Sequence, residues 1–224
     1  MDVYELRIRN RIMSNSIVEA YRKHADNYDF AVKLYHLLGI KIGKYRKITV
    51  NSLELSKGDT VVELGCGSGL NFSLVLDKIG IEGKLIGVDI TDKMLDQARK
   101  RVNENGWKNV ELVQSDFAEY QFPQELDGIF ATGALQYSTQ YDKIVKQGHN
   151  ALKSTKKFVI MDFKMSQGPA KIFAPLIVSF TKPFAADEEY LKRTAWKSIE
   201  KYFEKTSYQE GWGGFLYISV GTKF

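Results

Sequence analysis

The sequence predicts an α/β fold built on a doubly wound, mostly parallel sheet. Between residues 60 and 163, short apolar runs rich in β-branched residues alternate with segments of helical periodicity. A loop with glycine at every second position, Glu63 to Gly69, directly follows the first apolar run. Near the end of the chain, a glycine-rich tetrapeptide at 211–214 joins two extended runs, which is typical of a hairpin. Strands that alternate with helices favour parallel pairing, because each helix returns the chain to the same end of the sheet.

The expected elements follow in chain order. Residues 16–50 place apolar side chains three and four positions apart and break at Gly39, so they are predicted to be helical. We expect strands near 60–64, 84–89, 110–114, 126–132 and 157–163, and helices near 70–79, 92–104 and 139–152. Thr91 is expected to cap the second of these helices. Helices and loops are expected over 168–204, and two hairpin strands over 204–210 and 215–222.

Composition limits the classes of protein that fit. Of the 224 residues, 44% are hydrophobic and 26% are charged, which indicates one globular domain with a substantial core. The single cysteine, Cys66, cannot form a disulfide within the chain, and three separated histidines predict no metal site. The net charge of +5 is uneven: +5 over 1–50, −6 over 51–136 and +6 over 137–224. The basic flanks are typical either of solvated helices or of a surface that meets an anionic partner.

The loop at Glu63–Gly69 and Asp89 together predict a nucleoside pocket. Asp89 ends the second apolar run, twenty residues after the loop. Glycines allow the backbone to approach a ligand closely, and an acid at the tip of the next strand can accept hydrogen bonds from ribose hydroxyls. The glycines are spaced G-x-G-x-G, and a carboxylate at position 63 would repel a pyrophosphate but attract a cation. The pattern therefore favours a cationic nucleoside over a dinucleotide.

The segment Glu63-Leu64-Gly65-Cys66-Gly67-Ser68-Gly69 resembles motif I of the class I S-adenosylmethionine-dependent methyltransferases. The resemblance implies a Rossmann-like, seven-stranded sheet of order 3-2-1-4-5-7-6 that ends in the antiparallel hairpin. It also implies that S-adenosylmethionine is the cofactor. The cofactor-binding residues implied by this resemblance are Glu63, Gly65, Cys66, Gly67, Asp89, Ile90, Met94, Ser115, Asp116, Phe117, Thr132 and Gly133. Asp89 would hold the ribose hydroxyls, and Asp116 would accept a hydrogen bond from the adenine amino group.

A second resemblance lies outside this core. Residues 20–29 are similar to the N-terminal helix of methyltransferases that act on quinones and membrane lipids, in which this helix covers the cofactor. The resemblance adds Tyr21 and Tyr28 as cofactor contacts, although both could equally be helix-packing residues. Segments 106–112, 182–184, 195–199 and 213–218 resemble phosphatidylethanolamine and betaine-lipid N-methyltransferases. One departure is Lys153-Ser154-Thr155-Lys156, where relatives carry a Pro-Gly-Gly turn, and we expect it to alter only a surface turn.

With these resemblances, we expect one domain with four parts: an N-terminal helical cap (1–50), a cofactor-binding core (51–165), a helical roof over the acceptor site (166–206) and the hairpin (207–224). The roof contains a short apolar stretch between Lys171 and Lys182. About ten residues cannot cross a bilayer, but they could form a buried lid or lie in a membrane interface. The charged N-terminus lacks the apolar core of a signal peptide, so a cytoplasmic location, peripheral to the inner membrane face at most, is expected.

The expected reaction is methyl transfer to an amine head group of a lipid or a similar amphiphile. Transfer from a sulfonium depends mainly on in-line positioning in a dry pocket, so the sequence identifies no catalytic base. A soluble small-molecule or quinone O- or C-methyltransferase would use the same residues, and a non-catalytic cofactor-binding module is a further alternative. A nicotinamide-dependent reductase is disfavoured, because no tyrosine is followed by lysine four residues later. No nucleic-acid partner is expected, since the aromatic-glycine signatures of RNA-binding sheets are absent.

Overall fold

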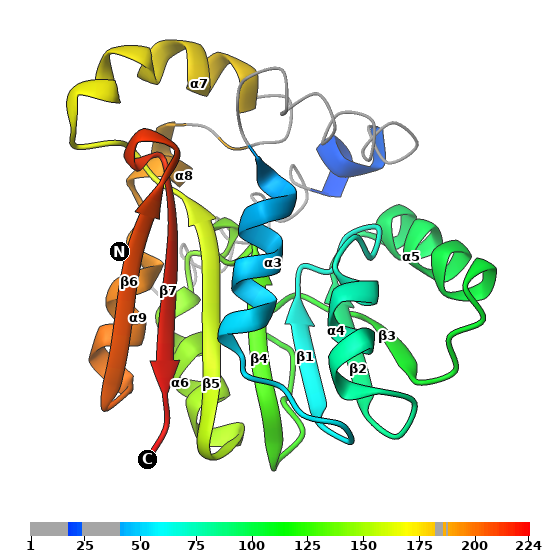
Figure 1. Cartoon of the computed structure of the whole chain (residues 1–224). Coiled ribbons are helices and arrows are strands. Elements are labelled where there is room, and N and C mark those ends of the chain that lie inside the picture. The colour runs from blue at the N-terminus through cyan, green and yellow to red at the C-terminus, as the bar shows by residue number, and fades with distance from the viewer. Residues whose placement is uncertain (1–17, 24–40, 182–185, 187) are drawn as a thin grey trace.

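The computed structural model describes residues 18–23, 41–181, 186 and 188–224 (Figure 1). In this part of the chain, one sheet has the order β3-β2-β1-β4-β5-β7-β6. The strands are β1 Thr60–Leu64, β2 Lys84–Asp89, β3 Val110–Gln114, β4 Leu126–Thr132, β5 Leu152–Phe163, β6 Lys205–Gly211 and β7 Leu216–Thr222. Strands β1 to β5 pair in parallel, and β7 is antiparallel to both β5 and β6. The predicted fold class and strand order are confirmed.

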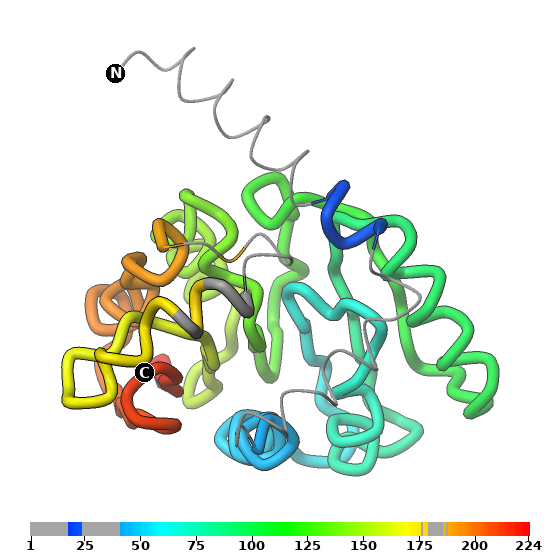
Figure 2. The backbone as a smooth tube through the Cα atoms, turned by 90° about the horizontal axis from the view of Figure 1, so that it is seen from above, coloured from blue at the N-terminus to red at the C-terminus, as the bar shows by residue number. Residues whose placement is uncertain are grey.

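Helices cover both faces of the sheet. From residue 41 on, the helices are α3 Ile42–Ser52, α4 Phe72–Ile79, α5 Asp92–Glu104, α6 Tyr141–Ala151, α7 Ala174–Thr181, α8 Glu188–Lys192 and α9 Ala195–Tyr202, with short 3-10 turns η3 Leu135–Tyr137, η4 Pro169–Phe173 and η6 Trp212–Gly214. Figure 2 shows α3 and α4 on one side of the sheet and α6 and α9 on the other. Successive residues of a strand point to opposite faces of the sheet. Val61 packs with α3, α4 and α5, whereas Val62 packs with α6 and α9. The central strands are buried on both faces, as parallel strands under helices require.

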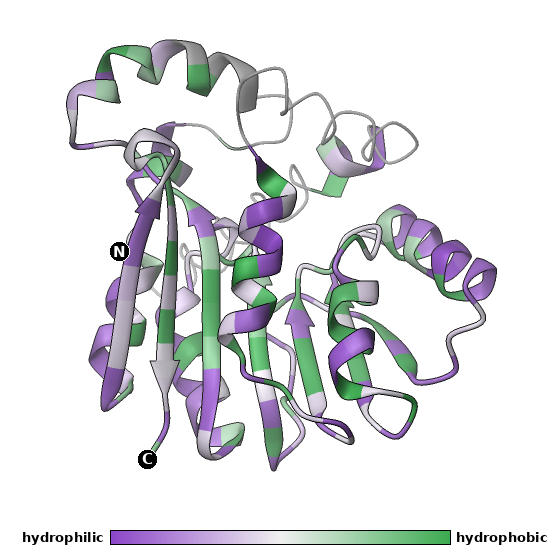
Figure 3. Ribbon diagram, viewed as in Figure 1, coloured by the Kyte–Doolittle hydropathy of each residue, from purple (hydrophilic) through white to green (hydrophobic). Residues whose placement is uncertain are grey.

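The segment 166–206, predicted as a roof, divides into two parts. Helix α9 packs against α6 and β7, so it belongs to the layer that covers the sheet. The turn η4 and helix α7 lie beyond the carboxyl ends of the strands, at the top of Figure 1. Their ribbon includes hydrophobic segments at the outer end of the molecule (Figure 3). Within the described residues, every helix is too short or too polar to span a bilayer.

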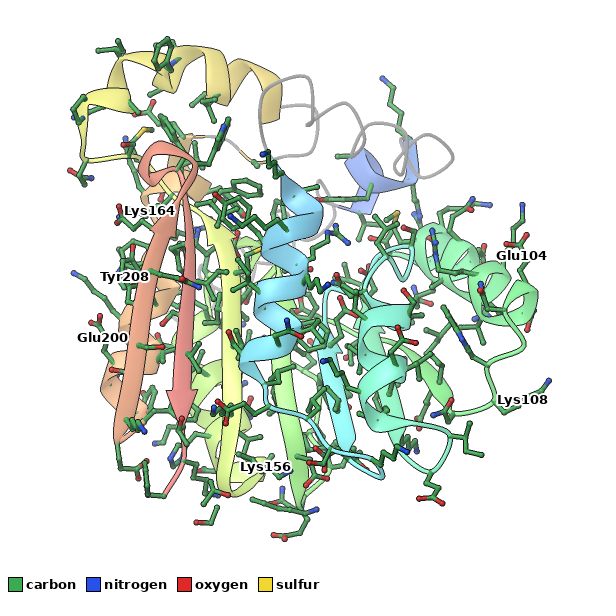
Figure 4. All side chains as sticks on the ribbon, in the orientation of Figure 1. Glu104, Lys108, Lys156, Lys164, Glu200 and Tyr208 are labelled. Atoms are coloured by element: carbon green, nitrogen blue, oxygen red, sulfur yellow. The ribbon has the colours of Figure 1, made fainter. Side chains whose placement is uncertain are left out.

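The departure at 153–156 lies at the opposite end of the sheet, near the bottom of Figure 4. These residues belong to the start of β5, at the point where its pairing with β4 shifts register, and Ser154 and Thr155 are exposed. Thr155 has a φ of +66°, and its N–H donates to the carbonyl of Lys223 at 2.7 Å. The Lys156 ammonium is 3.1 Å from a carboxylate oxygen of Asp59. These contacts are remote from the carboxyl ends of β1, β2 and β4, where the glycine loop lies.

Candidate functional site

The glycine loop leaves the carboxyl end of β1 in a conformation that requires glycine. The N–H groups of Gly65 and Cys66 donate to the carbonyl of Val88 at 2.8 and 3.1 Å, which holds the loop beside the end of β2. Gly65 has a φ of +73°, and a Cβ placed there would lie 2.2 Å from the Cβ of Ala134. A side chain at position 65 is therefore excluded both by backbone strain and by a direct clash.

Asp89 fixes the loop to the tip of β2. One carboxylate oxygen of Asp89 accepts the Gly67 N–H at 2.9 Å, and the other accepts the Thr91 N–H at 2.8 Å. The side chain is buried, and this burial raises its pKa, while the N–H donors of Thr91 and Gly67 oppose the rise. Each carboxylate oxygen has a second lone pair, so Asp89 can hold the loop and still accept hydrogen bonds from ligand hydroxyls.

A pocket of about 820 Å³, counting the part open to solvent, lies over these strand tips. Ten residues predicted to bind the cofactor line it: Tyr21, Gly65, Gly67, Asp89, Ile90, Met94, Asp116, Phe117, Thr132 and Gly133. The described lining holds two carboxylates and no lysine, arginine or histidine. A negative lining of this kind favours a cationic ligand over a phosphate-bearing one.

Three of the predicted residues lie beside the pocket instead of lining it. The Glu63 side chain is buried on the α3 and α4 side of the sheet, where its Oε1 accepts a hydrogen bond from Asn71 Nδ2 at 2.6 Å. The Cys66 thiol is also buried, and burial raises its pKa well above the usual value, which makes it a poor nucleophile. The Ser115 hydroxyl donates to the carbonyl of Asp116 at 3.0 Å. Tyr28 lies outside the described residues.

Glu63 is nevertheless coupled to the site through Asn71. The Asn71 amide nitrogen also donates to the hydroxyl of Thr132, which lines the pocket, at 2.9 Å. Burial raises the pKa of Glu63 to about 8; the Asn71 hydrogen bond and the charge of Arg46 oppose the rise, and Asp89 adds to it. The second oxygen of Glu63 is buried without a hydrogen-bond partner. The neutral acid is therefore the dominant form of Glu63 at pH 7.

Six further residues line the pocket that were not among the cofactor-binding residues predicted from the sequence: Thr91, Ala134, Tyr137, Ser138, Thr139 and Gln140. Most of them belong to the turn η3 and the residues after it, which follow β4. The rule that ligands bind at the carboxyl ends of strands points to this turn, but it does not say how far the turn folds back over the site. Here the Tyr137 ring turns toward Tyr21: their hydroxyls are 3.1 Å apart, and the rings meet edge to face.

A buried network under η3 holds Tyr137 in place. The Tyr190 ring, from α8, lies 4.6 Å from the Tyr137 ring, and its hydroxyl donates to Asp162 at the end of β5. Arg193 donates to the backbone carbonyls of Gln136 and Tyr137. Burial raises the pKa of Asp162 to about 6, against the hydrogen bonds it accepts from Tyr190 and from two backbone N–H groups. The pocket therefore has a wall of tyrosines that is supported from behind.

Residues 55–209 match a family model described as a methyltransferase domain. The chain belongs to this family. Together with the acid-lined pocket behind a glycine loop, this membership makes the protein a methyltransferase that uses S-adenosylmethionine. The predicted enzyme class and cofactor are confirmed by the family match and by the relatives that follow.

The known proteins that are similar to this chain are methyltransferases whose names give different acceptors. A demethylmenaquinone methyltransferase of Lactobacillus johnsonii is 26% identical over 207 residues, which cover 88% of this chain and 84% of the relative. A SAM-dependent methyltransferase from Aquifex aeolicus superposes with a TM-score of 0.61 at 19% identity, covering 80% of this chain and 89% of that one. A phosphoethanolamine N-methyltransferase from Haemonchus contortus, solved with S-adenosylhomocysteine, superposes with a TM-score of 0.65 at 16% identity, covering 80% of this chain and 52% of that one. The two solved structures are similar to this chain in fold.

The pocket suits S-adenosylmethionine on two grounds. Gly65 and Gly67 line the pocket, so backbone without side chains can approach the ligand there, and the buried Asp89 provides acceptors for a pair of hydroxyls. When bound, the cofactor supplies an electrophilic methyl group on a sulfonium. The described residues contain no cluster of three or more potential metal ligands. For transfer from a sulfonium, the chain's own contribution is to hold the cofactor, keep water out and orient the acceptor.

Proposed function

We propose that this enzyme methylates the head group of a lipid-tailed acceptor, and that the head group is an amine. The observation that carries the proposal is the tyrosine pair, Tyr21 and Tyr137, at the pocket wall. Aromatic faces attract cationic amines, and the two carboxylates in the pocket lining, Asp89 and Asp116, add to this attraction. The tyrosine pair would hold the amine close to the methyl donor, while Asp89 and Asp116 hold the cofactor.

The reaction needs little acid–base help from the protein. A free amine attacks the methyl carbon with its lone pair, the bond from carbon to sulfur breaks, and sulfur leaves as a neutral thioether. An amine that arrives as an ammonium first releases its proton to water. Positioning in line with the breaking bond then contributes most of the rate enhancement.

A quinone ring is the second candidate acceptor. It is supported by the Lactobacillus johnsonii relative, whose similarity extends over most of both chains. A quinone also carries an apolar tail, so both candidates would need access for a lipid. They differ in charge: only the amine brings a cation to the tyrosines.

Methyl transfer to defined acceptors separates the candidates. Purified protein with isotopically labelled S-adenosylmethionine is offered vesicles that contain phosphatidylethanolamine, vesicles that contain demethylmenaquinone, and soluble phosphoethanolamine, with products identified by mass spectrometry. The proposal expects N-methyl lipid as the main product. Methylated quinone as the main product would select the second candidate, and faster methylation of the soluble amine would reject a lipid-tailed acceptor.

Variants at Tyr137 test whether its aromatic ring binds the cationic amine. Tyr137→Leu removes the aromatic face and is expected to raise the KM for the amine about 3- to 30-fold, the range of one cation–π contact. Tyr137→Phe keeps the face and should change this KM less than about threefold. Equal effects of the two substitutions would show that the ring does not bind a cation.

A further inference from the structure

A second hollow lies on the other side of the tyrosine wall, between η4 and α7 above and α8 and α9 below. It measures about 1510 Å³, counting space open to solvent. Its apolar side is formed by Met165, Val178 and Leu191, with Ala174 and Pro175. Tyr190, which packs on Tyr137 of the cofactor pocket, precedes Leu191 of this groove. Tyr137 and Tyr190 pack in one apolar cluster with Met165, Val178 and Leu191 of the groove, so this cluster lies between the two hollows.

Lysine side chains line this groove, whereas the described lining of the cofactor pocket contains none. Lys164, Lys171, Lys192 and Lys197 line it, and Glu188 is the one carboxylate among its described lining residues. Glu188 lies 2.8 Å from Lys192. Lys164 is buried and paired with Glu210 of β6, and its ammonium also lies over the Trp196 ring.

The remaining two lysines are free to meet an anion from outside. Lys171 and Lys197 are exposed, and neither has a carboxylate of the described residues within ion-pairing distance. Their charge is therefore not neutralised inside the described structure. An anion at the mouth of the groove would complement both lysines.

An exposed apolar pair directly follows Lys171. Ile172 is 77% exposed and Phe173 is 55% exposed, both in η4. Two adjacent large apolar side chains beside unpaired lysines are typical of a segment that rests in a membrane interface, where the apolar groups enter the lipid and the lysines meet its phosphates. Among the described residues, the other strongly exposed aliphatic and aromatic side chains are Ile81 and Phe224, which are separate from each other and from this end of the molecule.

We propose that this groove and the η4 turn bind an anionic phospholipid at a membrane surface, with an acyl chain along the apolar wall and the phosphate at Lys171 and Lys197. The proposal identifies the partner that presents a lipid-tailed acceptor, and in that respect it rests on the proposed function. The η4 turn and the cofactor pocket lie at the same end of the sheet (Figure 1). Docking there brings lipid head groups next to the tyrosine wall.

The test is vesicle flotation, which does not depend on methyl transfer. The full chain is mixed with phosphatidylcholine vesicles, with and without phosphatidylglycerol, at low salt. We expect binding to the anionic vesicles and little to the neutral ones. Ile172→Ser with Phe173→Ser should lower the partition coefficient at least about tenfold, because two apolar side chains leave the lipid. Lys171→Gln with Lys197→Gln should lower it about 30-fold, since each lysine near an anionic surface contributes about 1 kcal/mol.

Each double variant has a matched control of the same composition. Ile81→Ser with Phe224→Ser removes an exposed isoleucine and an exposed phenylalanine elsewhere. Lys57→Gln with Lys108→Gln removes two exposed lysines, and Lys108 lies on the far side of the molecule from Lys164 (Figure 4). The controls should bind within about twofold of the unaltered protein. Controls that lose as much binding as the groove variants, or groove variants that bind normally, would overturn the proposal.

Quenching by lipid separates the groove from the surface around it. Trp196 lines the groove, so phosphatidylglycerol with brominated acyl chains should quench its fluorescence. The quenched component should disappear in Trp196→Phe. Quenching that persists in this variant would place the acyl chain outside the groove. Because neither experiment measures methylation, the lipid site and the proposed acceptor can fail independently.

Discussion

Two hollows lie on either side of one tyrosine wall, and they have opposite charge. The cofactor pocket is lined by Asp89 and Asp116 and is built on strand tips and a glycine loop. The neighbouring groove is lined by four lysines and is built on short helices. The comparison indicates that the two hollows bind ligands of opposite charge: the acidic pocket suits a cationic nucleoside, and the basic groove suits the anionic part of a lipid. Each prediction below tests one side of this contrast.

The largest expected effect is at Gly65. Gly65→Ala places a Cβ against Ala134 and forces alanine into a left-handed conformation, so cofactor affinity should fall more than about 100-fold. Gly106→Ala is the control, because Gly106 has a similar φ of +67° with nothing within 4 Å of a Cβ. The control should cost about 1–3 kcal/mol of stability and leave cofactor affinity unchanged, as measured by calorimetry. Equal affinities for the two variants would show that the cofactor does not lie against Gly65.

The next effect concerns Glu63, whose pKa of about 8 exceeds its ordinary value. The folded state then holds a proton that the unfolded chain has lost, so stability falls as pH rises through the interval below 8. Between pH 6 and 8 the loss should be about 2–3 kcal/mol. Glu63→Gln should flatten this slope in urea unfolding experiments.

Asp162 offers an internal control for that slope. Its pKa of about 6 also lies above the ordinary value, so its stabilising contribution also falls as pH rises, but most of this loss occurs below pH 6. Asp162→Asn should therefore change stability below pH 6 and leave the slope from pH 6 to 8 intact. A slope that survives Glu63→Gln would mean that Glu63 is ionised in the folded protein.

A smaller effect is expected at Asp89. Asp89→Ala should weaken cofactor binding by about 1–3 kcal/mol, the cost of leaving buried hydrogen-bonding groups unpaired. Asp96→Ala, on the exposed side of α5 with Arg99 as its partner, is the matched control and should have no effect. If calorimetry finds the same cofactor affinity for both variants, the ribose does not bind at the end of β2.

The smallest expected effect on the cofactor pocket is that of salt. Its carboxylates are partly or fully buried, so raising sodium chloride from about 0.1 to 0.5 M should change cofactor affinity less than about threefold. Binding to anionic vesicles depends on exposed lysines and should be lost over the same range. A cofactor affinity as sensitive to salt as vesicle binding would remove the contrast between the two hollows.

The two hollows also differ in how much the sequence could predict. Local patterns predict the cofactor pocket well, because Gly65, Gly67 and Asp89 follow their strands directly, and parallel strands bring such tips together. The same reasoning fails for Glu63. Its place before the loop suggested a pocket residue, but the two-residue period of β1 turns its side chain to the α3 and α4 face.

The groove was beyond prediction because it depends on tertiary contacts. Its lining comes from segments between 164 and 197 that meet only when η4, α7, α8 and α9 are folded. The sequence indicated an apolar stretch between Lys171 and Lys182, but it did not distinguish a buried lid from a membrane contact. The structure adds the direction of each side chain: Ile172 and Phe173 face outward, while Val178 faces the groove. The contact between Tyr137 and Tyr21 was beyond prediction for the same reason, since it joins residues more than a hundred positions apart.

A crystal structure with S-adenosylhomocysteine bound tests the central claim most directly, because the claim concerns where the nucleoside lies. We expect the ribose hydroxyls within hydrogen-bonding distance of Asp89 and the loop at Gly65 against the amino-acid part of the ligand. Density for the nucleoside in the lysine-lined groove, or a ribose that makes no contact with Asp89, would contradict the account.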